Sequence, residues 1–134
     1  MTVYGLDTNV LIRLLTDDDP QQRRAALQFG AGIGRDYSAF VSLIALLELD
    51  WALRSRLGFS RKTSLDAIDK LLRTRGLHVE HHDLVVQSLQ LALRKNADFA
   101  DSLIAACSLG AGCLSVKTFD QKAAARVPGM ELLA

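Results

Sequence analysis

Short apolar runs alternate with amphipathic segments along the whole chain. The apolar runs have the length and composition of β-strands, and they cover residues 2–6, 39–41, 77–80, 113–116 and 131–133. In the segments between them, apolar residues recur every three or four positions, which is the period of a helix with one buried face. These segments predict helices over residues 9–15, from 20 to about 30, from 43 to about 56, from 61 to near 76, and over 83–95, 99–109 and 119–126. Because strands that alternate with helices form parallel sheets covered on both faces, we expect one α/β/α domain spanning residues 1–134, with a parallel sheet of four to five strands.

Several helix starts carry their own local signals. Pro20 follows three aspartates, and acids before a proline at the first helical position complement the helix dipole. Ser42, Ser60 and Asp83 each stand where a side-chain oxygen can cap the following helix. In the helix after Ser42, the apolar stripe predicts that Trp51 faces the core.

Composition narrows the class of protein. The chain has 134 residues, of which 49% are hydrophobic and 23% charged, so it can bury a core without disulfides or structural metals. Its apolar runs are too short to cross a bilayer and its start lacks a secretory signal, so we expect a cytoplasmic protein with no membrane partner. Cys107 and Cys113 are expected to be small, reduced core residues. An aromatic share of 6% does not indicate a stacking platform for single-stranded nucleic acid.

Five carboxylates occupy positions that favour chemistry. Asp7 ends the first predicted strand and Asp120 follows the fourth, and ligands of open parallel sheets lie beyond the carboxyl ends of the strands. Asp98 and Asp101 share the first turn of a predicted helix, while Glu48 lies in an otherwise apolar helix. Each acid alone is explained by helix capping or by a salt bridge, in the case of Glu48 to a nearby arginine. Gathered together they would repel one another unless a divalent cation held them, and hard oxygen ligands favour Mg²⁺ or Mn²⁺.

Two other patterns are weaker signals. Gly30, Gly32 and Gly34 resemble a nucleotide-binding loop in spacing, but they follow a predicted helix and precede a strand, so we interpret them as a helix stop. The acids and histidines at residues 80–83 could in principle bind zinc, but capping of the next helix explains them more simply.

The acidic motifs resemble those of PIN domains, and more closely those of the VapC toxins of bacterial type II toxin–antitoxin pairs. The resemblance rests on Leu6-Asp7-Thr8-Asn9, on Leu47-Glu48, on residues 97–106 and on Thr118-Phe119-Asp120. It implies a three-layer PIN-like fold and a Mg²⁺- or Mn²⁺-dependent endoribonuclease that hydrolyses tRNA, rRNA or mRNA. It also implies a homodimer, held inactive by a cognate VapB-like antitoxin, in some cases within a larger assembly.

The same resemblance assigns roles to individual residues. Asp7, Glu48, Asp101 and Asp120 match the four central acids of the family, and Asp98 matches a less uniform acid. Asp7 and Asp101 are expected as principal metal ligands and Glu48 and Asp98 as secondary ones, with Asp120 binding a second metal or positioning water. Thr118 matches a hydroxyl residue that supports the site.

The charge balance fits a polyanionic substrate. The chain has sixteen basic residues and, apart from the five candidate acids, ten acidic ones. Without the candidate acids the net charge is therefore +6, whereas the net charge of the whole chain is +1. The basic residues considered for phosphate contacts, which set affinity but not sequence preference, are Arg13, Arg54, Arg56, Arg61, Lys62, Arg94, Lys95 and Lys117.

Two alternative functions remain open from the sequence. A receiver-like signalling domain also binds Mg²⁺ through acids at strand ends, although it gives no role to Glu48 or to the pair Asp98 and Asp101. A catalytically silent PIN-like module that only recruits a partner would keep the fold without the cleavage.

Overall fold

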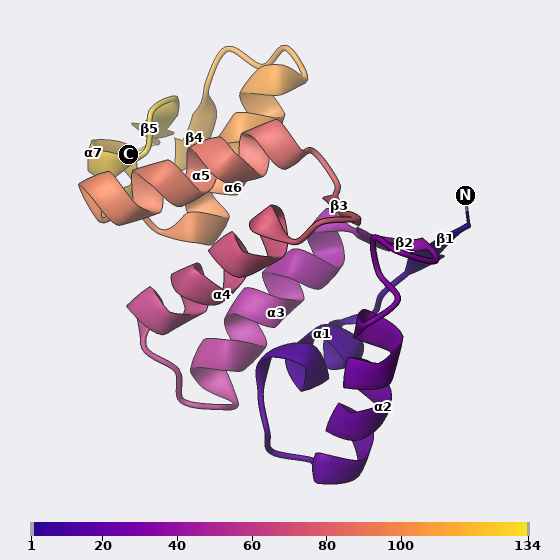
Figure 1. The fold of residues 1–134 in the computed structure, drawn as a ribbon. Coiled ribbons are helices and arrows are strands. Elements are labelled where there is room, and N and C mark those ends of the chain that lie inside the picture. Colours follow the sequence, from indigo (N-terminus) through magenta and orange to yellow (C-terminus); the bar gives the residue numbers. More distant parts are fainter. Residues whose placement is uncertain (1, 134) are drawn as a thin grey trace. The chain divides into compact units, whose positions relative to one another are not determined.

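The structure is a computed structural model that describes residues 2–133, and the chain divides into two compact units between Glu80 and His81 (Figure 1). Each unit has its own strands and helices, and we describe each by itself. Five strands are present among the described residues, as the sequence predicts, and all their pairings are parallel. They form a ladder of three in the first unit and a ladder of two in the second.

The first unit is built on a three-stranded parallel sheet with the strand order β1-β2-β3. Its elements are, in chain order, β1 (Val3–Gly5), α1 (Thr8–Leu15), α2 (Pro20–Gly30), β2 (Ser38–Val41), α3 (Leu43–Ser55), α4 (Arg61–Arg73) and β3 (Leu77–Val79). Tyr4 is in register with Ala39, and Phe40 with His78. Each parallel step is therefore bridged by two helices, the connection that parallel strands require.

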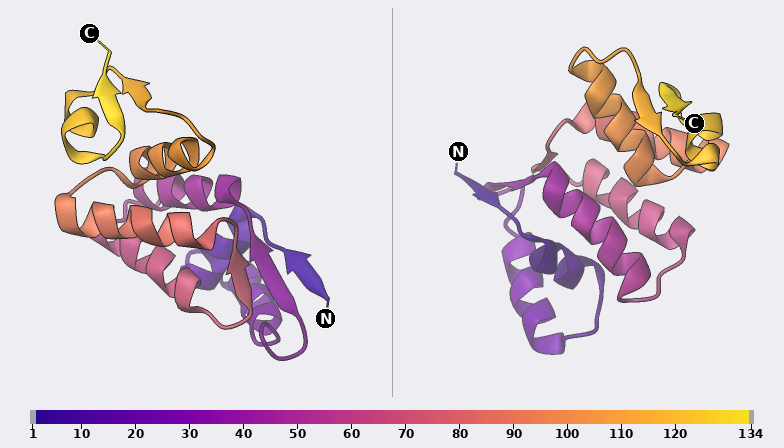
Figure 2. Two further views of the ribbon diagram at one scale, coloured as in Figure 1. Left: turned by 90° about the horizontal axis from the view of Figure 1, so that it is seen from above. Right: turned by 180° about the vertical axis from the view of Figure 1, so that it is seen from behind.

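The core of the first unit lies where α1, α3 and α4 meet. Leu11, Leu46, Leu49, Leu53 and Ile68 are all fully buried. Figures 1 and 2 show α3 and α4 running side by side, and α1 packs against both α2 and α3. Burying one such side chain contributes about 1.5–3 kcal/mol relative to leaving it exposed, so these positions fix the helices that carry Asp7 and Glu48.

Two glycines pack directly against each other before strands β2 and β3. Gly34 and Gly76 both have φ near +80°, a backbone conformation that side chains disfavour. A Cβ on Gly76 would lie 2.4 Å from the Cα of Gly34, and a Cβ on Gly34 would lie 2.7 Å from the carbonyl oxygen of Arg75. The glycine-rich segment after α2 is thus a turn that permits close backbone contact, which agrees with its interpretation as a helix stop.

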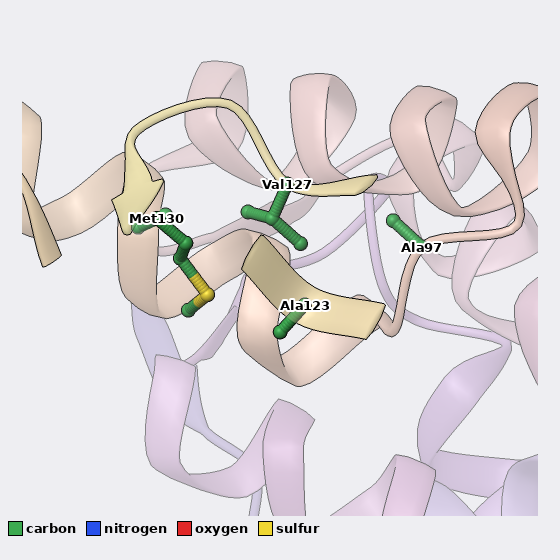
Figure 3. Packing of buried hydrophobic residues seen from close by; sticks show 5 residues of the cluster. Ala97, Ala123, Val127 and Met130 are labelled. Carbon is green, nitrogen blue, oxygen red and sulfur yellow. The ribbon is translucent and has the colours of Figure 1, made fainter. Parts of the chain in front are cut away.

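The second unit packs two longer helices with a small two-stranded parallel ladder. Its elements are α5 (His82–Lys95), α6 (Phe99–Gly110), β4 (Val116–Thr118), α7 (Gln121–Arg126) and β5 (Met130–Leu132). Val116 is in register with Met130, and α7 connects the two strands. Buried small and apolar side chains hold these parts together: Ala97, Ala105, Ala123, Val127 and Met130, with Leu91 and Val116 packed against them (Figure 3).

The structure corrects several details of the predicted elements. β4 begins at Val116, three residues later than predicted, and Cys113 is exposed instead of buried. The residue before α5 is His81, in the left-handed conformation and without a side-chain cap, so Asp83 does not cap this helix. Trp51 is 59% exposed, which makes its assignment to the core wrong. Ser42 and Ser60 do cap α3 and α4, as predicted. Within residues 2–133, none of the helices has the length and apolar character needed to span a bilayer.

Candidate active site

Asp7 stands at the junction between β1 and α1. Its carboxylate Oδ1 accepts a hydrogen bond from the backbone N–H of Val10 at 3.0 Å, which makes Asp7 the N-cap of α1. Leu6, immediately before it, continues the strand by donating its N–H to the carbonyl of Phe40 at 2.9 Å. The capping interaction fixes the side chain at the end of the strand and engages one carboxylate oxygen.

Glu48 lies beside Asp7 in the first unit. The hydroxyl of Thr8 donates to Oε1 of Glu48 at 3.2 Å and thereby links the first turn of α1 to α3. Asp7, Thr8 and Glu48 line one cavity of about 430 Å³, together with residues from the ends of β1 and β2 and the start of α3. Glu48 is exposed, so it does not carry the desolvation cost that its apolar neighbours in the sequence suggest. The sequence pattern did not single out Thr8 as a partner of Glu48.

Asp98 and Asp101 share the start of α6, as the sequence predicts. Oδ2 of Asp98 accepts a hydrogen bond from the backbone N–H of Asp101 at 2.9 Å, so Asp98 is the N-cap. Ser102 reinforces the turn, because its hydroxyl donates to the carbonyl oxygen of Asp98 at 2.7 Å. Asp101 itself is half-buried in the first turn of the helix.

Asp120 is the N-cap of α7 and is positioned by Thr118. Its Oδ1 accepts from the backbone N–H of Ala123 at 3.0 Å, and its own N–H donates to the Thr118 hydroxyl at the same distance. Thr118 thus supports an acidic residue through its hydroxyl, which is the kind of role that the resemblance assigned to it.

Two other aspartates of the second unit act on the carboxyl group of Asp101. Partial burial, and then the negative charges of Asp98 and Asp120, raise the pKa of the Asp101 carboxyl above its usual value. Like charges that raise a neighbour's pKa are a sign of carboxylates held together without a neutralising partner. The negative charges of Asp98 and Asp120 therefore act on the carboxyl group of Asp101.

The candidate residues fit a hard divalent cation by their chemistry. All of them offer oxygen, as carboxylates or as a hydroxyl, which is the donor type that Mg²⁺ and Mn²⁺ prefer. Among residues 2–133, no three histidine, cysteine, aspartate or glutamate side chains already lie close enough to one another to hold a metal ion. Two of the five candidate acids, Asp7 and Glu48, belong to the first unit, and the other three belong to the second.

A different carboxylate of α3 is the buried one. Asp50 is only 3% exposed, accepts from the buried Ser64 hydroxyl at 2.7 Å, and pairs with Arg54 at 2.8 Å. Arg54 is one of the arginines near Glu48 in the sequence, but it lies four residues after Asp50 and pairs with that residue instead. The i, i+4 spacing of Asp50 and Arg54 was the available signal for this pair.

Several of the basic residues considered for phosphate contacts pair with acids in the described part of the chain. Salt bridges join Arg13 to Asp18, Arg54 to Asp50, Lys62 to Asp66 and Lys117 to Glu131. The Lys117 hydrogen bond and charge lower the pKa of the Glu131 carboxyl.

Comparison with known proteins places this arrangement in a family. The model of the PIN domain family matches residues 4–129, a span that includes every candidate site residue. The crystal structure of VapC20 from Mycobacterium tuberculosis, described as a toxin that cleaves the sarcin–ricin loop, is similar at 20% sequence identity and a TM-score of 0.46. That likeness covers 92% of this chain and 94% of the VapC20 chain. No curated protein matches the sequence. Because the family match covers nearly the whole chain, the protein belongs to the PIN domain family, whose members are nucleases.

Proposed function

We propose that the protein is a VapC-type toxin, an endoribonuclease that hydrolyses RNA phosphodiester bonds with Mg²⁺ or Mn²⁺. The observation that carries the proposal is the complete set of acids in a PIN domain: Asp7, Glu48, Asp98, Asp101 and Asp120. Each of them stands in an ordered strand end or helix, and none forms a salt bridge among those found in residues 2–133. A set of acids without basic partners suits a cation better than a structural role.

The candidate residues have different roles in this proposal. Asp7 and Asp101 are the principal metal ligands, and Glu48 and Asp98 are secondary ones. Asp120 binds a second cation or orients the attacking water, while Thr118 and Thr8 hold Asp120 and Glu48 through their hydroxyl groups. Capping engages one carboxylate oxygen each of Asp7, Asp98 and Asp120, so the helix ends fix the direction in which the other oxygen points. When bound, the cation would lower the pKa of a water and neutralise charge on the phosphodiester.

The expected partners follow from the VapC type. The substrate is a cellular RNA, either tRNA, rRNA or mRNA, and a cognate VapB-like antitoxin inhibits the enzyme in the cytoplasm. The toxin acts as a homodimer, which can join a larger toxin–antitoxin assembly. Membership of the PIN family removes the basis for the receiver-like alternative, and the complete set of acids favours an enzyme over a silent binding module.

The test compares two aspartates that have the same structural role. Asp7 caps α1 and Asp19 caps α2, in each case by accepting a hydrogen bond from a backbone N–H three residues later. Asparagine is as good an N-cap as aspartate, so Asp7→Asn and Asp19→Asn should both fold, and only the first removes a proposed ligand. We expect antitoxin-free wild type and Asp19→Asn to cleave RNA with Mg²⁺ or Mn²⁺ and to lose activity in EDTA. Asp7→Asn should be inactive. Cleavage by Asp7→Asn at the wild-type rate would refute the site, and a wild type that binds metal but cuts no RNA would favour the silent module.

A further inference from the structure

Asp7 also lines a second cavity of the first unit. It has a volume of about 510 Å³ and lies between the end of β1 and helices α1 and α2, entirely within the first unit. The lining residues that matter for its chemistry are Tyr4, Asp7, Asn9, Arg13, Gln22 and Phe29. Pockets of this size commonly hold small organic groups. Because Asp7 lines this cavity as well as the one it shares with Glu48, a group bound here would lie next to the proposed reaction centre.

Aromatic side chains gather at this cavity although the chain has few of them. Three of the eight aromatic residues form one cluster, in which Phe29 stacks on Tyr37 at 4.9 Å and Tyr4 meets both rings edge-on. The Tyr37 hydroxyl donates to the carbonyl oxygen of Phe29 at 2.6 Å, which fixes the end of α2 against the cluster. Tyr4 and Phe29 also line the cavity, and Tyr4 is 47% exposed. The few aromatic residues of the chain are thus not spread evenly, because two of them line the same cavity as Asp7.

The polar groups of the cavity argue against a phosphate as its occupant. Among the described residues that line the cavity, Arg13 is the one cation, and its guanidinium already donates to Asp18 at 3.0 Å and to Oε1 of Gln22 at 2.7 Å. Asp7 adds a negative charge that would repel an anion. The remaining polar side chains, Asn9 and Gln22, carry amides, which can both donate and accept hydrogen bonds. An occupant with an apolar flat face and a polar edge suits this lining, and an unpaired nucleobase has that form.

We propose that this cavity, which we call the α1–α2 cavity, binds an unpaired base of the RNA substrate next to the scissile phosphate. The inference rests on the proposed ribonuclease function and adds a subsite to it. Proteins commonly recognise single-stranded RNA by stacking splayed bases on aromatic rings and by hydrogen bonds to their edges. Here Tyr4 and Phe29 supply the aromatic surface, and Asn9 and Gln22 supply the edge contacts that distinguish one base from another.

Filling the cavity tests the inference without touching a proposed metal ligand. Ala25 is an exposed residue of α2 that lines the cavity, and Gln28 is an exposed residue of the same helix that does not. Ala25→Trp should block the cavity, while Gln28→Trp places the same side chain elsewhere on α2. The substrate is a short single-stranded RNA with one cleavage site, in which the nucleotides flanking the cut are made abasic one at a time.

We expect one abasic position to lower the kcat/KM of the wild type by about tenfold or more, the usual scale of a stacked base. Ala25→Trp should show a similar loss on intact RNA and no further loss on that abasic RNA, because both changes remove the same contact. Gln28→Trp should behave as the wild type does. Equal cleavage of intact RNA by Ala25→Trp and wild type would overturn the inference. The inference would also be overturned if the abasic position lowered the kcat/KM of Ala25→Trp as much as it lowers that of the wild type.

A binding measurement separates failure of the inference from failure of the proposed function. In EDTA, fluorescence anisotropy of the labelled intact RNA should show that Ala25→Trp binds about tenfold more weakly than the wild type. Gln28→Trp should bind the RNA as tightly as the wild type does. A protein that cuts no RNA but shows this difference would refute the ribonuclease function and keep the base site. Equal binding by all three proteins would overturn the base site even if RNA is cleaved. An Ala25→Trp protein that cleaves normally but escapes the antitoxin would also overturn it, and would assign the cavity to a protein partner.

Discussion

Ser64→Ala tests the buried hydrogen bond that ties α4 to α3, the helix that carries Glu48. The Ser64 hydroxyl is fully buried and donates to Oδ1 of Asp50 at 2.7 Å, and Asp50 is itself 3% exposed. A hydrogen bond to a charged group contributes about 1.5–3 kcal/mol to stability. Alanine removes only the hydroxyl oxygen and leaves Arg54 paired with Asp50. We therefore expect Ser64→Ala to lower the free energy of unfolding by about 1.5–3 kcal/mol.

Asp50→Ala should lower the free energy of unfolding by more than Ser64→Ala does, because it removes the acceptor of two hydrogen-bond donors at once. The Ser64 hydroxyl loses its partner in the core, and so does the guanidinium of Arg54, which lies 2.8 Å from Oδ2. Breaking a buried pair from one side typically costs about 3–5 kcal/mol. The side chain of Arg54 is 35% exposed and can turn toward water, which places the expected loss near the lower end of that range.

Urea unfolding followed by circular dichroism measures these losses, with Asp66→Ala as the matched control. Asp66 pairs with Lys62 at the same i, i+4 spacing, but over 3.7 Å and in an exposed position, so its removal should change stability by no more than about 0.5 kcal/mol. The double variant of Asp50 and Ser64 should lose less than the sum of the single losses, by about 1.5–3 kcal/mol. The reasoning is refuted if Ser64→Ala is as stable as Asp66→Ala, or if the two losses simply add.

Three further predictions follow from individual contacts. Gly76→Ala should lower the free energy of unfolding by about 2–5 kcal/mol, because it combines a positive φ with a Cβ 2.4 Å from Gly34, and thermal unfolding of the purified variant checks the loss. Glu80→Ala should cost about 0.5–2 kcal/mol, since Oε1 of Glu80 accepts from the backbone N–H of Leu43 at the start of α3; equal urea midpoints for variant and parent would contradict this. The pKa of Asp101 is raised in the fold, so without metal its ionisation removes stability as the pH rises through that pKa. Asp101→Asn should therefore be more stable than the parent in EDTA at neutral pH, and this advantage should vanish in acid, where Asp101 is protonated; an advantage that persists unchanged in acid would show that charge is not its cause.

Local signals account for most of the predicted fold. Helix starts could be predicted wherever a short polar side chain precedes an apolar segment, and Ser42 and Ser60 do cap their helices. Asp83 failed as a cap because the chain enters α5 through His81 in the left-handed conformation. The predicted start of β4 was too early because the strand extends only as far as its pairing with β5. The apolar residues before Val116 do not show which residues of the two strands pair.

The buried face of α3 could not be predicted from its own sequence. The helix carries apolar residues on several faces. The spacing of these residues is therefore as compatible with a buried face that includes Trp51 as with one formed by Leu46, Leu49 and Leu53. The buried face is determined by the contact with α4, where the Ser64 hydroxyl donates a hydrogen bond to Asp50 in the core. Because that contact joins residues fourteen positions apart, the sequence pattern of α3 does not contain it.

The candidate acids were predictable because each stands at a strand end or in the first turns of a helix. The structure brings Asp7 and Glu48 to one cavity, and it couples Asp101 electrostatically to Asp98 and Asp120. The Thr8 hydroxyl bond to Glu48 could not be predicted, because it depends on how α1 packs against α3. That these acids bind a divalent cation stays a prediction from their chemistry and from the family.

Calorimetric titration with Mn²⁺ tests that prediction most directly, using Asp7→Asn, Asp101→Asn and the capping control Asp19→Asn. If Asp7 and Asp101 are the principal metal ligands, then Asp7→Asn and Asp101→Asn should each weaken Mn²⁺ binding by at least about tenfold. Asp19→Asn should bind as tightly as the wild type. Wild-type affinity for Mn²⁺ in either Asp7→Asn or Asp101→Asn would contradict the ligand role proposed for that residue.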